Sequence, residues 1–493
     1  MSSMLPKTLQ MREMSLAKRL LTSTGWMVSA TYLNAGISFV GNIFLARLLS
    51  PNDFGIYALA ASLLALLFMI SGFGTHESIV QCRDDGIQYL IPTAFWMTIG
   101  LGLGLSLSGS LLALYLLPSY GETVARLIML LSWLNFAGMV GNTYGAVLKR
   151  ELNFKLIAMT QIISTFISFG VAGLVAYLGW GIWSLFVREA TWTIVVLAGF
   201  AWASGYRLQF RFDIGAAHWV WAFGWKVMGN RIGEVLFERV DKLVAGSFLG
   251  TTILGQYSLA YRLAFAAHQF SYGMIQSISL SAFSSVQQQM DKLRLAFEKI
   301  YYWLFRFVIL LGLLVWFCGA ELVVVIYGAQ WQLAGSIFQA MAVFLMLLPL
   351  ETSLRSFLIG SGYINSNLRV RVWQLLFFFP AILVSAYWGD IIWVVWSINA
   401  SIFLSWLLAI RYSSRVVIVR WSYLMQKPLI AGFITFALVT GITYIGLLGQ
   451  GGLIGVLLRG SVVAVMVILT LYLTEHHSLR TEWAMIRARL ASS

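Results

Sequence analysis

Charged residues and cysteine are scarce in this chain of 493 residues. Only 11% of the residues are charged, which excludes a water-soluble globule. Cysteine occurs twice, at Cys82 and Cys318, so we expect neither a disulfide framework nor a thiolate metal site. The segments between hydrophobic runs are short and leave no room for a soluble catalytic domain. We therefore expect a protein that is not an enzyme and that holds no metal or other cofactor.

Hydrophobic residues are abundant instead, at 59% of the chain, and the mean hydropathy is +0.81. Runs without any charged residue cover 20–46, 86–121, 127–148, 391–410 and 428–458. Because a helix crosses the hydrocarbon core with roughly 20 apolar residues, the longest of these runs hold more than one span. We predict an all-α polytopic membrane protein with about fourteen transmembrane helices. They lie near 21–46, 55–80, 90–117, 123–148, 156–178, 181–203, 219–248, 253–281, 300–327, 332–359, 367–388, 391–412, 427–447 and 452–474.

Basic residues collect in alternate loops of this topology. Arg47 and Arg126 lie in the other set of loops. Since short cytoplasmic loops retain Lys and Arg, both termini are predicted to be cytoplasmic. The net charge of +14 is explained by this topology and by anionic lipids, so no nucleic acid is expected as a partner. The basic set comprises Lys7, Arg12, Lys18, Arg19, Arg83, Lys149, Arg150, Lys155, Arg207, Arg211, Lys292, Arg294, Lys299, Arg369, Arg371, Arg411, Arg415, Arg420, Lys427, Arg480, Arg487 and Arg489.

Two short motifs recur about 200 residues apart and in the same order. Gly-x-Tyr-x-Leu-Ala occurs at 55–60 and 255–260, and Gly-Trp-x-Val occurs at 25–28 and 224–227. The repeat predicts two parallel lobes of six spans each, followed by two C-terminal helices, and such halves typically rock around a central site. We assign 1–20 to a cytoplasmic segment, 21–203 to the N-terminal lobe, 219–412 to the C-terminal lobe, 427–474 to the last two spans and 475–493 to a cytoplasmic tail.

The seventh span is the most highly charged one, although a charge in hydrocarbon is costly unless it meets water or a partner. Helical spacing puts its charged residues on one broad face, with the exception of Arg239, which lies off that face. This stripe favours a helix that lines a hydrated cavity between the lobes. A self-neutralised ladder of i,i+4 contacts is the alternative, and both can hold together. The stripe contains Lys226, Asn230, Arg231, Glu234, Glu238, Asp241 and Lys242.

Other spans hold isolated charged positions. Arg262 lies in the second copy of the repeated motif and is our first candidate for an anion contact. For the pairs Arg188–Glu189 and Glu351–Arg355, internal ion pairs and ligand contacts are left open. We expect Arg306, near the inner end of the ninth span, to snorkel to the interface. Glu321 is a further charged position in the ninth span. Arg47 and Asp53 flank the turn after the first span, where we expect a positioning role rather than substrate binding.

The segment 45–57, Leu-Ala-Arg-Leu-Leu-Ser-Pro-Asn-Asp-Phe-Gly-Ile-Tyr, resembles the Wzx-type polysaccharide flippases of the MOP superfamily. The basic N-terminus, Gly25-Trp26 and the pattern at 254–260 extend the resemblance over most of the chain. It implies a two-lobed, fourteen-helix protein that carries undecaprenyl-diphosphate-linked oligosaccharide to the outer leaflet of the bacterial inner membrane. Related lipid II flippases carry a Tyr-x-x-x-Arg-Leu-like sequence in the eighth span, and Arg262 has the similar position. Their first-span arginines have no counterpart between Arg19 and Arg47.

The cargo implied by this resemblance agrees with the residues, because a diphosphate needs several cationic donors. We assign substrate binding to Arg262, Arg231, Arg239, Lys242, Arg188 and Arg355, and proton or sodium coupling to Glu234, Glu238 and Asp241. Membrane lipids, a polysaccharide polymerase and chain-length machinery are the other partners considered for a monomeric protein. The alternative is a MATE-like cation-coupled drug antiporter, which would have a more acidic cavity. A membrane-embedded glycosyltransferase fits least, since no catalytic domain is present.

Overall fold

The computed structural model describes residues 7–71, 74–82, 86–285, 290–417, 419, 421–445 and 452–490. Within these ranges it leaves out the side chains of 7–25, 28, 226–227, 229–231, 234, 270–285, 290, 423 and 476–490. All regular structure in the described part is helical, as the predicted fold class requires. The chain divides into two compact units, Met1–Leu243 and Val244–Ser493, and each is described by itself.

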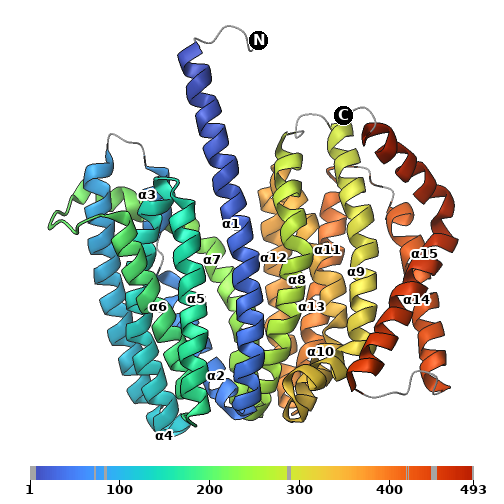
Figure 1. Cartoon of the computed structure of the whole chain (residues 1–493), viewed down its shortest axis with the longest axis horizontal. Helices are drawn as coiled ribbons and strands as arrows, with labels where there is room; N and C mark the ends of the chain where they lie inside the picture. The colour runs from blue at the N-terminus through green and yellow to red at the C-terminus, as the bar shows by residue number, and fades with distance from the viewer. Residues whose placement is uncertain are drawn as a thin grey trace. The chain divides into compact units, whose positions relative to one another are not determined.

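The first unit is a bundle in which α5 packs between α1 and α6, while α4 packs against α2, α3 and α6 (Figure 1). The helix α2 begins with a capping box, because Ser50 and Asp53 bond to each other's backbone N–H groups and Pro51 follows the cap. The elements are α1 (Lys7–Leu48), α2 (Pro51–Leu67), η1 (Phe68–Ile70), α3 (Thr75–Gln81), α4 (Ile87–Arg150), α5 (Phe154–Tyr177), α6 (Trp183–Ser204) and α7 (Ile214–Leu249), which continues into the second unit.

The second unit is arranged around α11, which contacts α8, α9, α12 and α13, while α14 and α15 pack on α9 (Figure 1). Its core holds large buried side chains such as Phe297, Tyr301 and Phe357. The elements are α8 (Thr251–Ser285), α9 (Met290–Tyr327), η3 (Ala329–Trp331), α10 (Gln332–Ala340), α11 (Ala342–Gly360), α12 (Ile364–Tyr387), α13 (Ile391–Ser413), α14 (Trp421–Tyr444) and α15 (Gly452–Leu490).

The helices agree with the predicted spans. Ten helices in the described residues are long and apolar enough to cross a membrane, so this is a multi-pass membrane protein. One of them, α4, contains two predicted spans that meet at Gly121, whose φ of 82° and ψ of 170° are not helical. The predicted span 55–80 comprises α2, η1 and α3, and the predicted span 332–359 comprises α10 and α11. A side chain would be strained at Gly121, and only glycine enters such a conformation readily.

Two helical hairpins, α5–α6 and α12–α13, provide a further internal match. Each of α5 and α12 is 24 residues long, and the segments 176–179 and 386–389 both read Ala-Tyr-x-Gly. The turn before each helix contains one residue with positive φ, Leu152 at 57° and Gly362 at 86°. The next backbone N–H closes the turn in both, from Asn153 to Leu148 at 2.9 Å and from Tyr363 to Leu358 at 2.8 Å. The two hairpins therefore share local backbone geometry as well as sequence.

Close helix contacts in the first unit depend on glycine. At Gly41 of α1, an added Cβ would lie 2.3 Å from the Phe169 ring of α5, whereas at Gly36 nothing lies within 4 Å. Small residues at such positions let transmembrane helices approach closely. We expect Gly41→Leu to destabilise the protein by about 3 kcal/mol, because the ring and the helix must move apart. Thermal unfolding in detergent checks this, with Gly36→Leu as the matched control. Equal melting temperatures of the two variants would contradict the packing argument.

Candidate functional site

The charged stripe of α7 is partly neutralised within the helix itself. Asp241 and Lys242 are buried, with 1% and 7% of their surface exposed. The Lys242 Nζ donates to the carbonyl oxygen of Glu238 at 2.5 Å and lies 3.8 Å from the Asp241 carboxylate. Glu238 and Arg239 are half-buried. The side chains of two further candidates, Arg231 and Glu234, lie outside the described residues. The ion pair of Lys242 is with its sequence neighbour and its bond to Glu238 is to the backbone, so both the i,i+4 ladder and the cavity-lining role stay predictions.

A second candidate cation, Arg188 of α6, lies in an aromatic and acidic setting within the first unit. Its guanidinium donates to the Glu189 carboxylate at 2.9 Å, and Tyr57 donates to the same carboxylate at 3.3 Å. The guanidinium carbon also lies 5.6 Å from the centre of the Phe169 ring and 6.0 Å from that of Tyr57. Tyr57 belongs to the repeated motif, so this motif contacts the Arg188–Glu189 pair. The pair forms an internal ion pair, one of the two interpretations left open by the sequence.

Arg355 belongs to a polar chain across three helices of the second unit. It lies 3.6 Å from Glu351, one turn away on α11, and its Nε donates to Asn367 of α12 at 2.8 Å. Glu351 is 1% exposed and also accepts from Ser405 of α13 at 2.7 Å. A buried carboxylate with two such partners is well stabilised. The i,i+4 ion pair is present, and phosphate binding by Arg355 would have to compete with it.

Arg262 lies half-buried on α8, next in sequence to a column of aromatic rings on that helix. Tyr261 stacks on Phe265 with ring centres 6.1 Å apart and contacts Tyr257 on the other side. Arg262 is also close enough to Tyr327, the last residue of α9, for an electrostatic interaction. A half-buried guanidinium that interacts with a tyrosine is a group that could bind a phosphate.

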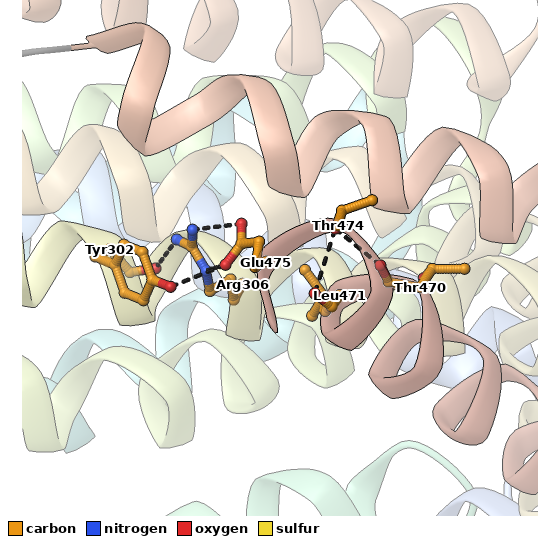
Figure 2. A network of polar contacts seen from close by, with 6 residues as sticks. All are labelled: Tyr302, Arg306, Thr470, Leu471, Thr474 and Glu475. Atoms are coloured by element: carbon orange, nitrogen blue, oxygen red, sulfur yellow. Dashed lines mark hydrogen bonds and ion pairs between the residues drawn. The ribbon is translucent and has the colours of Figure 1, made fainter. Parts of the chain in front are cut away.

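A buried ion pair that the sequence did not reveal joins α9 to α15 (Figure 2). Arg306 donates to both carboxylate oxygens of Glu475, at 2.8 Å from Nε and 2.6 Å from Nη2. Tyr302 donates to the same carboxylate at 2.8 Å, and its carbonyl oxygen accepts from Arg306 at 2.6 Å. Arg306 is 6% exposed and Glu475 1%. The expectation that Arg306 snorkels was therefore wrong, because α15 covers this face of α9 and brings a carboxylate to it.

A second pair with the charges exchanged joins the same two helices nearer their other ends. Glu321 of α9 accepts from Arg459 of α15 and from the backbone N–H of Gly452, the latter at 2.6 Å. Arg306 and Glu321 lie about four turns apart on α9, and so do Arg459 and Glu475 on α15. Both ion pairs can therefore form at once when the two helices run antiparallel. This complementary spacing was the available sequence signal. We name the two pairs, Arg306–Glu475 and Glu321–Arg459, the α9–α15 clamp.

The described residues contain no group of three or more His, Cys, Asp or Glu side chains that could hold a metal ion. Their buried charges are arranged instead as ion pairs and short polar chains within each unit. The Arg188 guanidinium lies beside the rings of Tyr57 and Phe169, and Arg262 interacts with Tyr327. Such settings suit recognition of anions.

A family model described as "Polysaccharide biosynthesis protein" matches residues 44–335, which is more than half of the chain. The chain belongs to this family. Its match begins in α1 and ends in α10. The resemblance based on residues 45–57 is thereby confirmed.

Individual proteins extend this likeness. The lipopolysaccharide biosynthesis protein WzxC of Escherichia coli (strain K12) is 25% identical over 384 residues, 75% of this chain and 76% of WzxC. The succinoglycan biosynthesis transport protein ExoT of Rhizobium meliloti (strain 1021) is 26% identical over 330 residues, 66% of either protein. A solved structure of the lipid II flippase MurJ, inward closed, has a TM-score of 0.75 at 10% identity and covers 92% of this chain and 99% of its own. At that identity the likeness shows the fold, and it confirms the predicted helical transporter fold.

Proposed function

We propose that this protein flips undecaprenyl-diphosphate-linked oligosaccharide from the cytoplasmic to the periplasmic leaflet of the bacterial inner membrane. The glycan is a precursor of O-antigen, capsule or exopolysaccharide. The observation that carries the proposal is membership of the polysaccharide biosynthesis family over residues 44–335, in a chain whose helices adopt a flippase-like fold. The names of WzxC and ExoT, a biosynthesis protein and a transport protein, agree with this role. A transporter of this kind is not an enzyme.

In the proposed mechanism, two lobes alternate between access from one leaflet and from the other. The N-terminal lobe covers 21–203, the C-terminal lobe covers 219–412, and 427–474 adds two helices. Both termini are cytoplasmic in this orientation, which the alternation of basic loops supports. The prenyl tail stays in lipid while the diphosphate and the sugars pass through a hydrated cavity. In this proposal the protein is a monomer and works beside a polysaccharide polymerase and chain-length machinery.

Cations in the spans would hold the diphosphate, with Arg262 as the principal contact. Its half-buried position on α8, close to Tyr327, supports this role. Arg188 and Arg355 already contact carboxylates, so they would contribute by exchanging partners or by setting the field of the cavity. The remaining cations assigned to the cargo are Arg231, Arg239 and Lys242.

Outward movement of an anion is favoured by an inside-negative potential, by about 2.3 kcal/mol per unit charge at 100 mV. A diphosphate that moved without compensation would gain roughly twice that amount. Exchange with a proton or sodium ion would return the empty carrier, and the carboxylates proposed for this coupling are Glu234, Glu238 and Asp241. Asp241 is buried next to Lys242, so protonation of its carboxyl would change the charge of the stripe.

Transport of the lipid-linked cargo can be measured with the purified protein in vesicles. Lipid-linked oligosaccharide from a strain that lacks the protein is added, and an impermeant sugar-oxidising reagent reports the outward-facing fraction. Because random insertion places about half of the cargo in either leaflet, protein-free vesicles should expose about half. With the protein, the exposed fraction should approach the whole during continued oxidation.

The same vesicles test the second candidate function, a cation-coupled drug antiporter. Such a carrier would extrude a fluorescent organic cation against an imposed ion gradient and leave the exposed fraction of oligosaccharide at half. The balance of charges weighs against it, since the spans hold at least as many Arg and Lys as Asp and Glu residues among the candidates. Extrusion of the cation without oligosaccharide movement would replace the flippase proposal.

A further inference from the structure

The segment between α6 and α7, residues 205–213, has no regular secondary structure and is held against α4 within the first unit. We name it the strap; in Figure 1 it is the unlabelled green connection between α6 and α7. The Trp96 indole N–H donates to the carbonyl oxygen of Gln209 at 3.0 Å, and the Asp213 N–H donates to Thr93 Oγ1 at 3.0 Å. Tyr206 stacks on Phe95 with ring centres 5.2 Å apart. The strap therefore has a fixed place on the first half of α4.

Large apolar side chains at the end of the strap face away from the protein. Phe210 is 90% exposed, Phe212 55% and Ile214, the first residue of α7, 79%. Phe210 keeps one ring contact, with Trp96 at 5.1 Å between centres. Two bulky aromatic side chains and an isoleucine exposed within five residues form an apolar surface that water would disfavour. We therefore expect Phe210, Phe212 and Ile214 to contact an apolar environment outside this unit.

Position along α4 indicates what that environment is. From Ile87 to Gly121 the helix rises roughly 50 Å, and the hydrocarbon core is roughly 30 Å thick. The first half of α4 thus extends about 10 Å beyond the hydrocarbon at each end. The strap contacts Tyr89, Thr93 and Trp96, which lie within roughly 14 Å of the start of the helix. Tyr89 and Thr93 thus fall at the level of the lipid headgroups and Trp96 just inside the hydrocarbon, so the strap lies at the membrane interface.

The charges of the strap identify the kind of lipid. Arg207 and Arg211 are exposed, and the Arg211 guanidinium lies 4.7 Å from the centre of the Tyr89 ring. The carboxylate of Asp213 accepts from the N–H of Ala216 at 2.7 Å and caps α7. Exposed guanidinium groups beside apolar side chains are the combination by which interfacial segments bind anionic membranes.

We propose that the strap is a binding site for anionic phospholipid, with Phe210, Phe212 and Ile214 inserted among the acyl chains and Arg207 and Arg211 on headgroup phosphates. In the proposed orientation the lipid belongs to the cytoplasmic leaflet. Because the strap is fixed to α4, bound lipid anchors the connection between α6 and α7 at the membrane surface. Lipid binding there is independent of the cargo.

A polarity-sensitive label tests the insertion in the full-length protein. In a Cys82→Ser/Cys318→Ala background, the label is attached at Phe210→Cys and, as the matched control, at Glu151→Cys, an exposed position after α4. In vesicles, the label at 210 should be quenched by lipids that carry a quencher near the headgroup and protected from iodide. The label at 151 should show the reverse. Equal iodide quenching at both positions would overturn the proposal, and so would protection of position 210 from both quenchers, which would place it against protein.

The anionic part is tested by lipid composition. Adding phosphatidylglycerol to phosphatidylcholine vesicles should increase lipid quenching at position 210, and Arg207→Gln with Arg211→Gln should weaken this dependence roughly fivefold per arginine. Arg126→Gln, which removes an exposed arginine from an i,i+4 pair far along α4, should leave it unchanged. Quenching that does not respond to phosphatidylglycerol in the parent protein would overturn the assignment of an anionic lipid.

Discussion

Replacing Glu475 by alanine is expected to destabilise the second unit by about 3–5 kcal/mol, because it leaves the guanidinium of Arg306 buried opposite an apolar side chain. Arg306 has 6% of its surface exposed and donates two bonds to this carboxylate. Tyr302 loses an acceptor at the same time. The loss should appear as a melting temperature several degrees lower in detergent and as a lower yield of folded protein.

An exposed ion pair provides the matched control. Glu122 and Arg126 are spaced i,i+4 on α4, with side chains about two thirds exposed, and pairs of this kind contribute little. Glu122→Ala should therefore leave the melting temperature nearly unchanged. The triple variant Glu475→Leu/Arg306→Leu/Tyr302→Phe should recover most of the stability lost in Glu475→Ala, since no buried charge stays without its partner. A Glu475→Ala protein as stable as the Glu122→Ala protein would show that the pair is not buried in the membrane-embedded molecule.

The helical fold could be predicted from composition because hydrocarbon allows few alternatives. Backbone groups in lipid must be bonded within the segment, so long apolar runs fix both the type of element and its approximate position. Breaks between spans were predicted at proline, glycine and polar residues. The predicted division near 117–123 coincides with Gly121, where positive φ interrupts α4.

Contacts between distant helices could not be predicted in the same way. The distance of Arg306 from the end of its span indicates only that its side chain is long enough to reach water. Its partner Glu475 is 169 residues away, and the burial of both depends on α15 packing against α9. Pairs close in sequence, such as Glu351 and Arg355, were identified because helical spacing alone brings them together. The role of each candidate in cargo binding depends on which side chains face the cargo, and it stays a prediction.

Replacing Arg262 by alanine is expected to slow flipping ten- to hundredfold, because a charge-assisted bond to phosphate is worth about 1.5–3 kcal/mol. The substitution removes a half-buried guanidinium from α8. The strain should lose surface polysaccharide and accumulate the lipid-linked precursor. Arg262→Lys should retain part of the rate, since it keeps the charge but loses bidentate geometry.

Two measurements separate a role in binding from a role in folding. Protein abundance and melting temperature should match those of the parent protein for both Arg262 variants, whereas Gly41→Leu lowers them. Raising the concentration of lipid-linked oligosaccharide in vesicles should restore part of the rate of Arg262→Lys, because weakened binding is offset by mass action. Arg126→Gln removes an exposed arginine and should flip at the parental rate. Normal surface polysaccharide in the Arg262→Ala strain would refute the assignment, since a principal phosphate contact cannot be removed without effect on transport.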